Sequence, residues 1–122
     1  MILRPVTLIL AAIAMSAAGT ASAQTQTSPP AYVTMVKTGW GMDSFMVVTP
    51  GQLVNPAGCR NPPLMPAPEG YISDVSMPGH QTYYLAALAA ITSHLRVVIT
   101  VNNNRCFLGR PVLIGINLLA GP

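Results

Sequence analysis

The chain has 122 residues, of which 51% are hydrophobic and only 7% are charged, with 6 basic and 3 acidic side chains. This length allows one domain rather than two. So few lysines and arginines exclude a nucleic-acid-binding protein that works by neutralising phosphates. The few carboxylates and histidines leave little material for polar catalysis. We therefore expect no nucleic-acid partner, no enzymatic activity and no cofactor.

The first 23 residues have the pattern of a secretory signal peptide. Arg4 gives a positive start, a short apolar stretch follows, and Ala21-Ser22-Ala23 forms an A-x-A cleavage site. A membrane-spanning helix needs about 20 apolar residues, and Ser16 interrupts this stretch too early. We expect cleavage after Ala23, a secreted or periplasmic location, and no membrane span in the mature chain.

The two cysteines, Cys59 and Cys106, both lie in the part of the chain that would be exported. An even number of cysteines in an oxidising compartment favours a disulfide. A redox pair or a metal site would require close spacing or additional His and Cys ligands, and the sequence offers neither. We predict a structural disulfide between Cys59 and Cys106 and no metal site.

Residues 24–30 are polar, lack an apolar anchor and predict a flexible leader. A single domain is predicted over residues 31–120. Within it, residues 50–69 form a proline-rich loop, because proline lacks the backbone donor that a central strand needs. Cys59 lies in the middle of this loop and would tie it down.

The domain is predicted to contain five strands and one helix. Runs of β-branched and aromatic residues indicate the strands, and a Leu- and Ala-rich segment without Pro or Gly indicates the helix. In chain order the elements are strands 32–38 and 43–49 joined by a turn at 39–42, a short strand in 70–75, a helix from 81 or 82 to 93, a strand at 95–102, a turn at 102–104, and a strand at 111–119. A helix between the third and fourth of five strands is the element order of an OB-fold, so we predict a small OB-like barrel. A two-layer α+β sandwich is the alternative.

The predicted helix carries no charged residue from Gln81 to Ser93. One stripe is expected to face the core; it contains Tyr84, Leu85, Leu88 and Ile91. The opposite face is then made of alanines. A helix that is apolar on all sides is usually covered on all sides, and so short a chain cannot supply the cover itself. We predict a homo-oligomer whose interface includes Ala86, Ala89 and Ala90; the alternative is that alanine is simply tolerated on an exposed face.

Four residues are weak candidates for ligand binding. Trp40 stands between two glycines at the tip of the predicted hairpin, where an aromatic ring is either a ligand contact or a lid over the core. Arg60, Arg105 and Arg110 lie near the two cysteines, so the disulfide could gather them into a positive patch for an acidic ligand.

The remaining acids and bases form no pair at a known motif spacing. His80 is expected at the start of the helix and His94 at its end, both as capping or surface residues. Asp43, Glu69 and Asp74 are the three carboxylates. We assign no catalytic residue.

The order of elements, with the Tyr83–Ala90 helix, the Leu95–Ile99 strand directly after it, Cys106 and the closing Val112–Ile116 strand, resembles the receptor-binding B subunits of bacterial A-B toxins of the pertussis, subtilase and typhoid toxin type. The resemblance runs from about Tyr32 to Leu119. It implies an OB-fold, a homopentamer with helices around a central pore, a surface that recognises sugars, and an enzymatic A subunit as partner. The family's sugar-contacting serine and aromatic positions have no match here, and the proline-rich loop is foreign to the family.

The sequence therefore leads to an exported, non-enzymatic protein that self-associates and binds a glycan or protein receptor. The alternative function is an accessory periplasmic or envelope protein whose apolar strands bind a partner protein.

Overall fold

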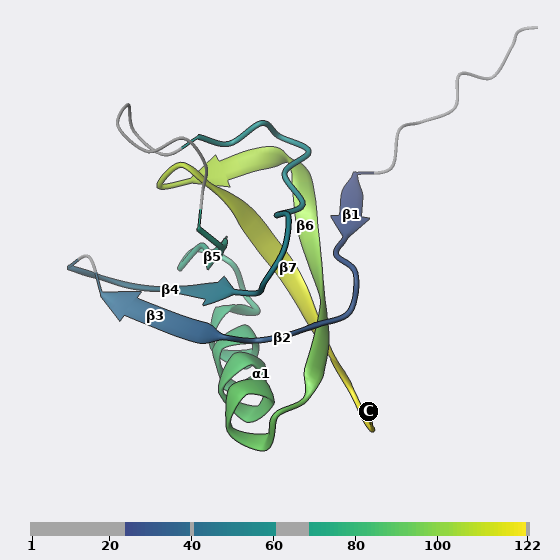
Figure 1. Cartoon of the computed structure of the whole chain (residues 1–122). Coiled ribbons are helices and arrows are strands. Elements are labelled where there is room, and N and C mark those ends of the chain that lie inside the picture. The colour runs from purple at the N-terminus through teal and green to yellow at the C-terminus, as the bar shows by residue number, and fades with distance from the viewer. Residues whose placement is uncertain (1–23, 40, 61–68, 122) are drawn as a thin grey trace, which may run out of the picture.

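A computed structural model describes residues 24–39, 41–60 and 69–121 of the chain. The expected signal peptide at 1–23, Trp40, and the loop residues 61–68 lie outside the described residues. The described chain is mainly β with one helix, as predicted from the sequence (Figure 1). In this part of the chain, no helix combines the length and the apolar content that crossing a membrane requires.

The strands form one mixed sheet, and the single helix packs against it. The elements are β1 (Thr25–Thr27), β2 (Ala31–Tyr32), β3 (Met35–Gly39), β4 (Met42–Val48), β5 (Tyr71–Ser73), α1 (His80–Ser93), β6 (Arg96–Phe107) and β7 (Arg110–Leu119). The order in the sheet is β1-β6-β7-β5-β4-β3, and β2 also pairs with β6. All pairs are antiparallel except β5 with β7. Strands occur in every region where one was predicted, and β6 is longer than expected. The strand predicted at 32–38 is divided into β2 and β3, which pair with different strands.

Residues 24–30 do not form a free leader. Thr25–Thr27 pairs with Thr100–Asn102 of β6, and beyond this strand the Ser28 N–H donates to the Ile99 carbonyl at 2.7 Å. The Ser28 hydroxyl in turn accepts from the Ile99 N–H at 2.9 Å. The prediction of a flexible leader at 24–30 was wrong because backbone pairing with a sheet edge needs no apolar side chains.

The turn predicted at Asn102–Asn104 was also wrong. These residues lie in β6, where the ladder to β7 is irregular between Val101 and Cys106. The chain instead reverses at Leu108 and Gly109, which have φ values of 47° and 73°, and Phe107 pairs with Arg110. Two residues of positive φ between paired strands are typical of the tight hairpin turns that match the twist of a sheet.

The core lies between the sheet and α1. Its buried residues include Phe45 and Val47 of β4, Tyr71 of β5, and Val97, Ile99 and Val101 of β6. Every second residue of β6 from Val97 to Val101 is buried in this core, as expected for a strand with one face covered. The Tyr83 hydroxyl donates to the Ile114 carbonyl at 2.8 Å and fixes the first turns of α1 to β7. Gly79 has no side chain at the point where the Tyr83 ring crosses it, and a Cβ there would collide with that ring.

The helix is rotated about its axis relative to the prediction: Tyr84 of the predicted stripe packs against the core, but Leu85 and Ile91 do not. Ala87 and Ala90 are buried at 0% and 1% exposure, whereas Leu85 is 66% exposed and Ile91 is 36% exposed. Small side chains let a helix approach a sheet closely, and the two tyrosines Tyr83 and Tyr84 fill the space beside them. Ala90 is thus part of the protein's own core and cannot serve as the interface residue that we predicted. Ala86 is half-buried and Ala89 is exposed.

Candidate functional site

A pocket of about 510 Å³ lies between the β3–β4 hairpin and the first turns of α1. Its polar lining comes from both sides: Thr38, Asp43 and Ser44 from the hairpin, and His80 and Gln81 from the helix. Aromatic and aliphatic side chains complete the wall: Met42, Phe45, Tyr84 and Leu85. A concave site that combines apolar walls with a few convergent polar groups is the usual composition of a small-molecule site.

His80 is a buried polar residue of the pocket wall. It is 7% exposed, and its Nδ1 lies 2.7 Å from the hydroxyl oxygen of Ser73. Its Nε2 lies 3.7 Å from Oδ1 of Asp43, a distance beyond that of a normal hydrogen bond. The ring also packs against Phe45, with the ring centroids 5.3 Å apart. The prediction that His80 is a capping or surface residue was wrong, because the first turn of α1 is packed inward against β4 and β5.

Asp43, His80 and Ser73 are the residue types of a catalytic triad. Their order of exposure is the reverse of a triad's, because the serine is buried and the carboxylate is exposed. Ser73 has 0% exposure, so its hydroxyl cannot reach a bound substrate, whereas the Asp43 side chain is 86% exposed. A serine nucleophile must be open to the substrate, with the base behind it and the carboxylate innermost. In this arrangement Ser73 orients the imidazole, and Asp43 faces outward, where a ligand can meet it.

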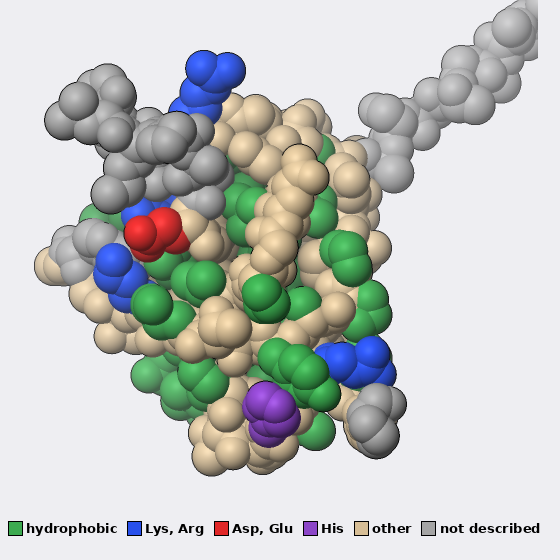
Figure 2. Space-filling view, in the orientation of Figure 1, with side chains coloured by type: hydrophobic (Ala, Val, Ile, Leu, Met, Phe, Trp, Pro, Cys, Tyr) green, Lys and Arg blue, Asp and Glu red, His purple; other side chains and the backbone are tan. Residues whose placement is uncertain are grey.

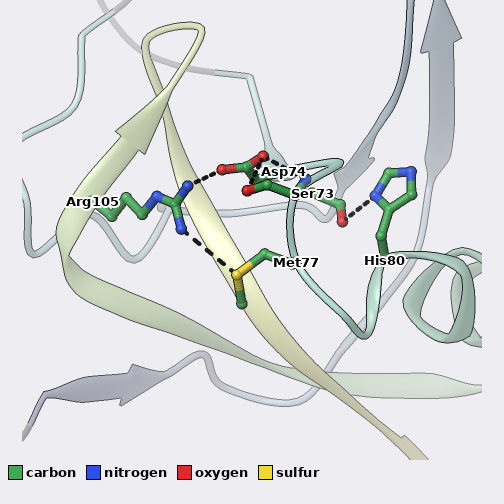
Figure 3. A network of polar contacts seen from close by, with 6 residues as sticks. Ser73, Asp74, Met77, His80 and Arg105 are labelled. Carbon is green, nitrogen blue, oxygen red and sulfur yellow. Dashed lines mark hydrogen bonds and ion pairs between the residues drawn. The ribbon is translucent and has the colours of Figure 1, made fainter.

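A second polar cluster lies beside the Ser73–His80 pair (Figure 3). Asp74 is buried and forms an ion pair with Arg105 of β6, and the same arginine lies 3.6 Å from the sulfur of Met77. Oδ1 of Asp74 accepts from the backbone N–H and the hydroxyl of Ser76, both at 2.9 Å. The hydrogen bond from the Ser76 N–H, with help from its hydroxyl and the Arg105 charge, holds the pKa of Asp74 below its ordinary value against the effect of burial.

The neighbouring residues Ser73 and Asp74 join this cluster to the pocket. Figure 3 shows the Ser73 side chain directed to His80 and the Asp74 side chain directed to Arg105, away from each other. Successive side chains in an extended chain point to opposite sides, which produces this division. The position of the pocket histidine is therefore coupled to the anchoring of β6.

The predicted disulfide between Cys59 and Cys106 is confirmed. It connects the long loop after β4 to the end of β6, next to Arg105. The loop is held further by Asn55, whose amide accepts from the Cys59 N–H at 2.7 Å and donates to the Cys59 carbonyl at 2.8 Å. The Tyr71 hydroxyl accepts from the Val54 N–H at 3.0 Å. Burial raises the pKa of Tyr71, while the hydrogen bond from Val54 opposes that shift.

Two of the three arginines of the predicted positive patch have partners within the protein. Arg60 is exposed, but the charge of Arg105 is paired with Asp74, and Arg110 donates to the Leu108 carbonyl at 2.7 Å. None of the three lines the pocket described above. Arg105 therefore has a structural partner, and an acidic ligand at this end would have to compete with the Asp74 carboxylate.

His94 ends the helix, as predicted. It is the residue after Ser93, with a φ of 53°, and its N–H is bonded to the Ala90 carbonyl. Its ring stacks on Tyr32 with the centroids 4.3 Å apart and the planes 9° apart. His94 thus caps α1 and connects it to β2, far along the helix from the pocket. Within the described ranges, no group of three or more His, Cys, Asp or Glu residues is placed to hold a metal ion.

Exposed hydrophobic side chains occur on several elements of the molecule, α1 among them. The exposed large hydrophobic residues are Met35, Met42, Val75, Leu85, Ile91, Leu108 and Leu118. On the face drawn in Figure 2, charged side chains are few and hydrophobic side chains are spread among polar ones. The exposed residues of α1 are uncharged and of mixed polarity: Leu85, Ala89 and Ile91 are apolar, and Gln81, Thr82, Thr92 and Ser93 are polar. This side therefore offers a partner an uncharged surface with apolar side chains in it.

No protein-family model, curated protein or solved structure matches this chain. The function is therefore argued from the geometry of the site itself.

Sequence reasoning missed most of the pocket. Asp43 and His80 stood out as titratable residues, but they are 37 positions apart in the sequence and belong to different elements. Thr38, Ser44 and Ser73 gave no signal at all, because serine and threonine are common in strands and turns. The useful clue was that His80 lies at the start of a helix whose first turns carry two tyrosines, an arrangement that favours packing inward.

Proposed function

We propose that this protein is an exported, non-enzymatic binding module that holds a small hydroxylated ligand, such as a sugar unit of a glycan, in the pocket between the β3–β4 hairpin and α1. One observation carries the proposal: the pocket joins hydrogen-bonding side chains from both the hairpin and the helix to the aromatic rings of Phe45 and Tyr84. Sugars present hydroxyl groups at their edges and apolar C–H groups on their faces, so they use both kinds of contact.

Ser44 adds support for a polar ligand. It is only 3% exposed, lines the pocket, and its hydroxyl has no hydrogen-bond partner. A buried hydroxyl without a partner is unfavourable. The Ser44 oxygen is closed to solvent, so the proposal requires its side chain to change rotamer when the ligand binds. A ligand hydroxyl in the pocket would supply the partner.

The buried position of Ser73 supports a non-enzymatic role. The Ser73–His80 pair has the 2.7 Å separation that a nucleophile and base require, yet the serine is closed to solvent. In this pair, the Ser73 hydroxyl fixes the orientation of the His80 imidazole in the pocket wall. We propose an extracellular or periplasmic location on the basis of the disulfide and the signal-peptide pattern at 1–23.

An OB-like barrel is the proposed form of the fold. The path β3-β4-β5-β7-β6 has the parallel β5–β7 pair in its middle and the helix between β5 and β6. β2 pairs with β6, and the chain runs from β2 through Val33 and Thr34 into β3, which pairs with β4. The two ends of the path are thus joined through one stretch of chain, which is the arrangement of a partly open, five-stranded barrel.

We propose that the chain self-associates through α1. The family resemblance implies a pentamer as the oligomeric state and a toxin-type A subunit as a partner. The support is the exposure of Leu85 and Ile91 on an uncharged helix. The same exposed face favours a second candidate function, an accessory envelope protein that binds a different protein. Analytical ultracentrifugation separates the two: a single oligomer of defined mass supports self-association, and a strict monomer contradicts it.

The pocket is tested with the variant Ser44→Ala. We expect it to weaken sugar binding severalfold while leaving the unfolding midpoint unchanged, because the hydroxyl has no partner to lose within the protein. Binding is measured by a glycan array, followed by NMR titration of the strongest hit. Ser93→Ala, at an exposed position outside the pocket, is the matched control. Unchanged affinity in the Ser44 variant, or an array without hits, would contradict the proposal.

A further inference from the structure

We infer that the ligand of this pocket carries a positive charge, as a protonated amine beside hydroxyl groups, and that Asp43 selects it. This inference rests on the proposed function and goes further by naming the ligand class, of which an amino sugar is the simplest example. It starts from the charges of the pocket wall and not from its shape.

The wall contains one carboxylate and no permanent positive charge. Asp43 is the acidic residue in the described lining, and neither lysine nor arginine occurs there. Lys37, next to the lining residue Thr38, forms an ion pair with Glu69 at 3.9 Å. The base in the described lining is His80, whose Nε2 lies 3.7 Å from Asp43. A bound anion would meet the exposed Asp43 carboxylate, whereas a bound cation would meet an oppositely charged group.

Asp43 is placed to serve a ligand rather than the fold. Its side chain is 86% exposed, and the His80 Nε2 at 3.7 Å is beyond hydrogen-bond distance. This differs sharply from Asp74, whose carboxylate is buried and used in full by Ser76 and Arg105. The Asp43 carboxylate consequently keeps capacity to accept hydrogen bonds from an ammonium group.

Aromatic rings reinforce the preference for a cation. Phe45 lines the pocket but is only 2% exposed, and its ring centroid lies 5.3 Å from that of His80 and 5.2 Å from that of Tyr84. Tyr84 is half-buried and lines the pocket, so part of its ring is open to a ligand. The negative faces of aromatic rings attract ammonium groups and also pack against the apolar face of a sugar.

The hydroxyl groups of the ligand have partners on the same wall. Thr38 and Ser44 offer hydroxyls, and Gln81 at the helix start offers an exposed amide. These groups donate and accept, so they suit sugar hydroxyls of either orientation. An amine next to hydroxyls on a six-membered ring thus uses the carboxylate, the rings and the neutral polar groups together.

The test compares sugars that share one ring and differ at one carbon. The oxidised protein is titrated by NMR with glucose, glucosamine and N-acetylglucosamine at neutral pH and low salt. We expect glucosamine to bind about three- to fivefold more tightly than the other two, the factor that a partly exposed ion pair provides. The preference should shrink in high salt, since screening weakens exposed charge pairs.

The variant Asp43→Asn should abolish the preference for glucosamine. Glu69→Gln is the matched control, because it removes an exposed carboxylate outside the pocket lining and should retain the preference. If glucose or N-acetylglucosamine binds at the pocket as tightly as glucosamine, or if the preference survives in Asp43→Asn, the cation inference is overturned while the binding function stands. If none of the three sugars shifts the signals of pocket residues, both the inference and the proposed sugar site are overturned.

Discussion

Two regions of this molecule are built in opposite ways. The disulfide end, defined by Cys59, Cys106, Asp74 and Arg105, is held by a covalent bond, an ion pair and the hydrogen bonds of Ser76. The helix face is defined by the pocket and by the exposed Leu85 and Ile91. In the pocket, the Ser44 hydroxyl has no hydrogen-bond partner and the Asp43 carboxylate is exposed. Groups that satisfy one another stabilise the fold, whereas groups left unsatisfied are available to a partner. We therefore assign stability to the first region and binding to the second.

The largest effect should come from removing the disulfide. Replacing both cysteines, Cys59→Ser with Cys106→Ser, releases a cross-link between residues 47 positions apart. The loop-entropy relation gives a loss of about 4 kcal/mol in the free energy of unfolding. Denaturant unfolding followed by circular dichroism measures it. A loss well below 1 kcal/mol would mean that the disulfide end is not the main source of stability.

The next effect should come from Asp74→Asn. It removes the charge that Arg105 and Ser76 use, and we expect a loss of about 2 to 3 kcal/mol at neutral pH, as for hydrogen bonds to charged groups. Because the pKa of Asp74 is lowered in the folded protein, its contribution is complete above the ordinary pKa and is lost as the pH falls through the folded value.

Unfolding experiments from pH 7 down to pH 2 provide the check. The difference in stability between the original protein and Asp74→Asn should narrow as the solution becomes more acidic than about pH 4, the ordinary pKa of aspartate. A difference that stays constant over this range would show that the charge of Asp74 does not stabilise the fold. Asp43→Asn, an exposed carboxylate, should leave the stability within about 0.5 kcal/mol throughout.

A pair of substitutions on one helix tests which face is buried. Ala87→Leu inserts three carbons into a packed core and should cost about 2 kcal/mol. Ala89→Leu places the same side chain on the exposed face and should change stability by no more than about 0.5 kcal/mol. Thermal unfolding of the two variants compares them directly. The reverse ranking would restore the orientation predicted from the sequence.

The smallest effect is expected for Tyr71→Phe. The ring stays in the core, but the Val54 N–H loses its acceptor, and we expect a loss of about 1 kcal/mol. Urea unfolding at pH 7 measures it, with the hydrogen exchange of the Val54 amide as a local probe. An unchanged exchange rate at Val54 would contradict the role given to this hydrogen bond in holding the loop.

The strands and the helix could be predicted from the sequence because they depend on local residue patterns. The disulfide could be predicted from the even number of cysteines and the expected oxidising compartment. Sequence reasoning misjudged the helix orientation, since α1 is apolar on every side and its periodicity cannot choose between Leu85 and Ala87. It missed β1 because edge pairing depends on backbone groups that no residue type reveals. It could not assemble the pocket, because Asp43, Ser73 and His80 come from three elements that only the sheet order brings together.

The adjacency of Ser73 and Asp74 has a consequence for how such a protein can diverge. One residue positions the histidine of the pocket, and the next anchors the strand that carries Cys106. A mutation that shifts this peptide by even a fraction of an ångström moves both at once. Changes in ligand preference should therefore accumulate at Thr38, Asp43 and Gln81, which can vary alone, while the peptide between the two regions stays fixed over long evolutionary times.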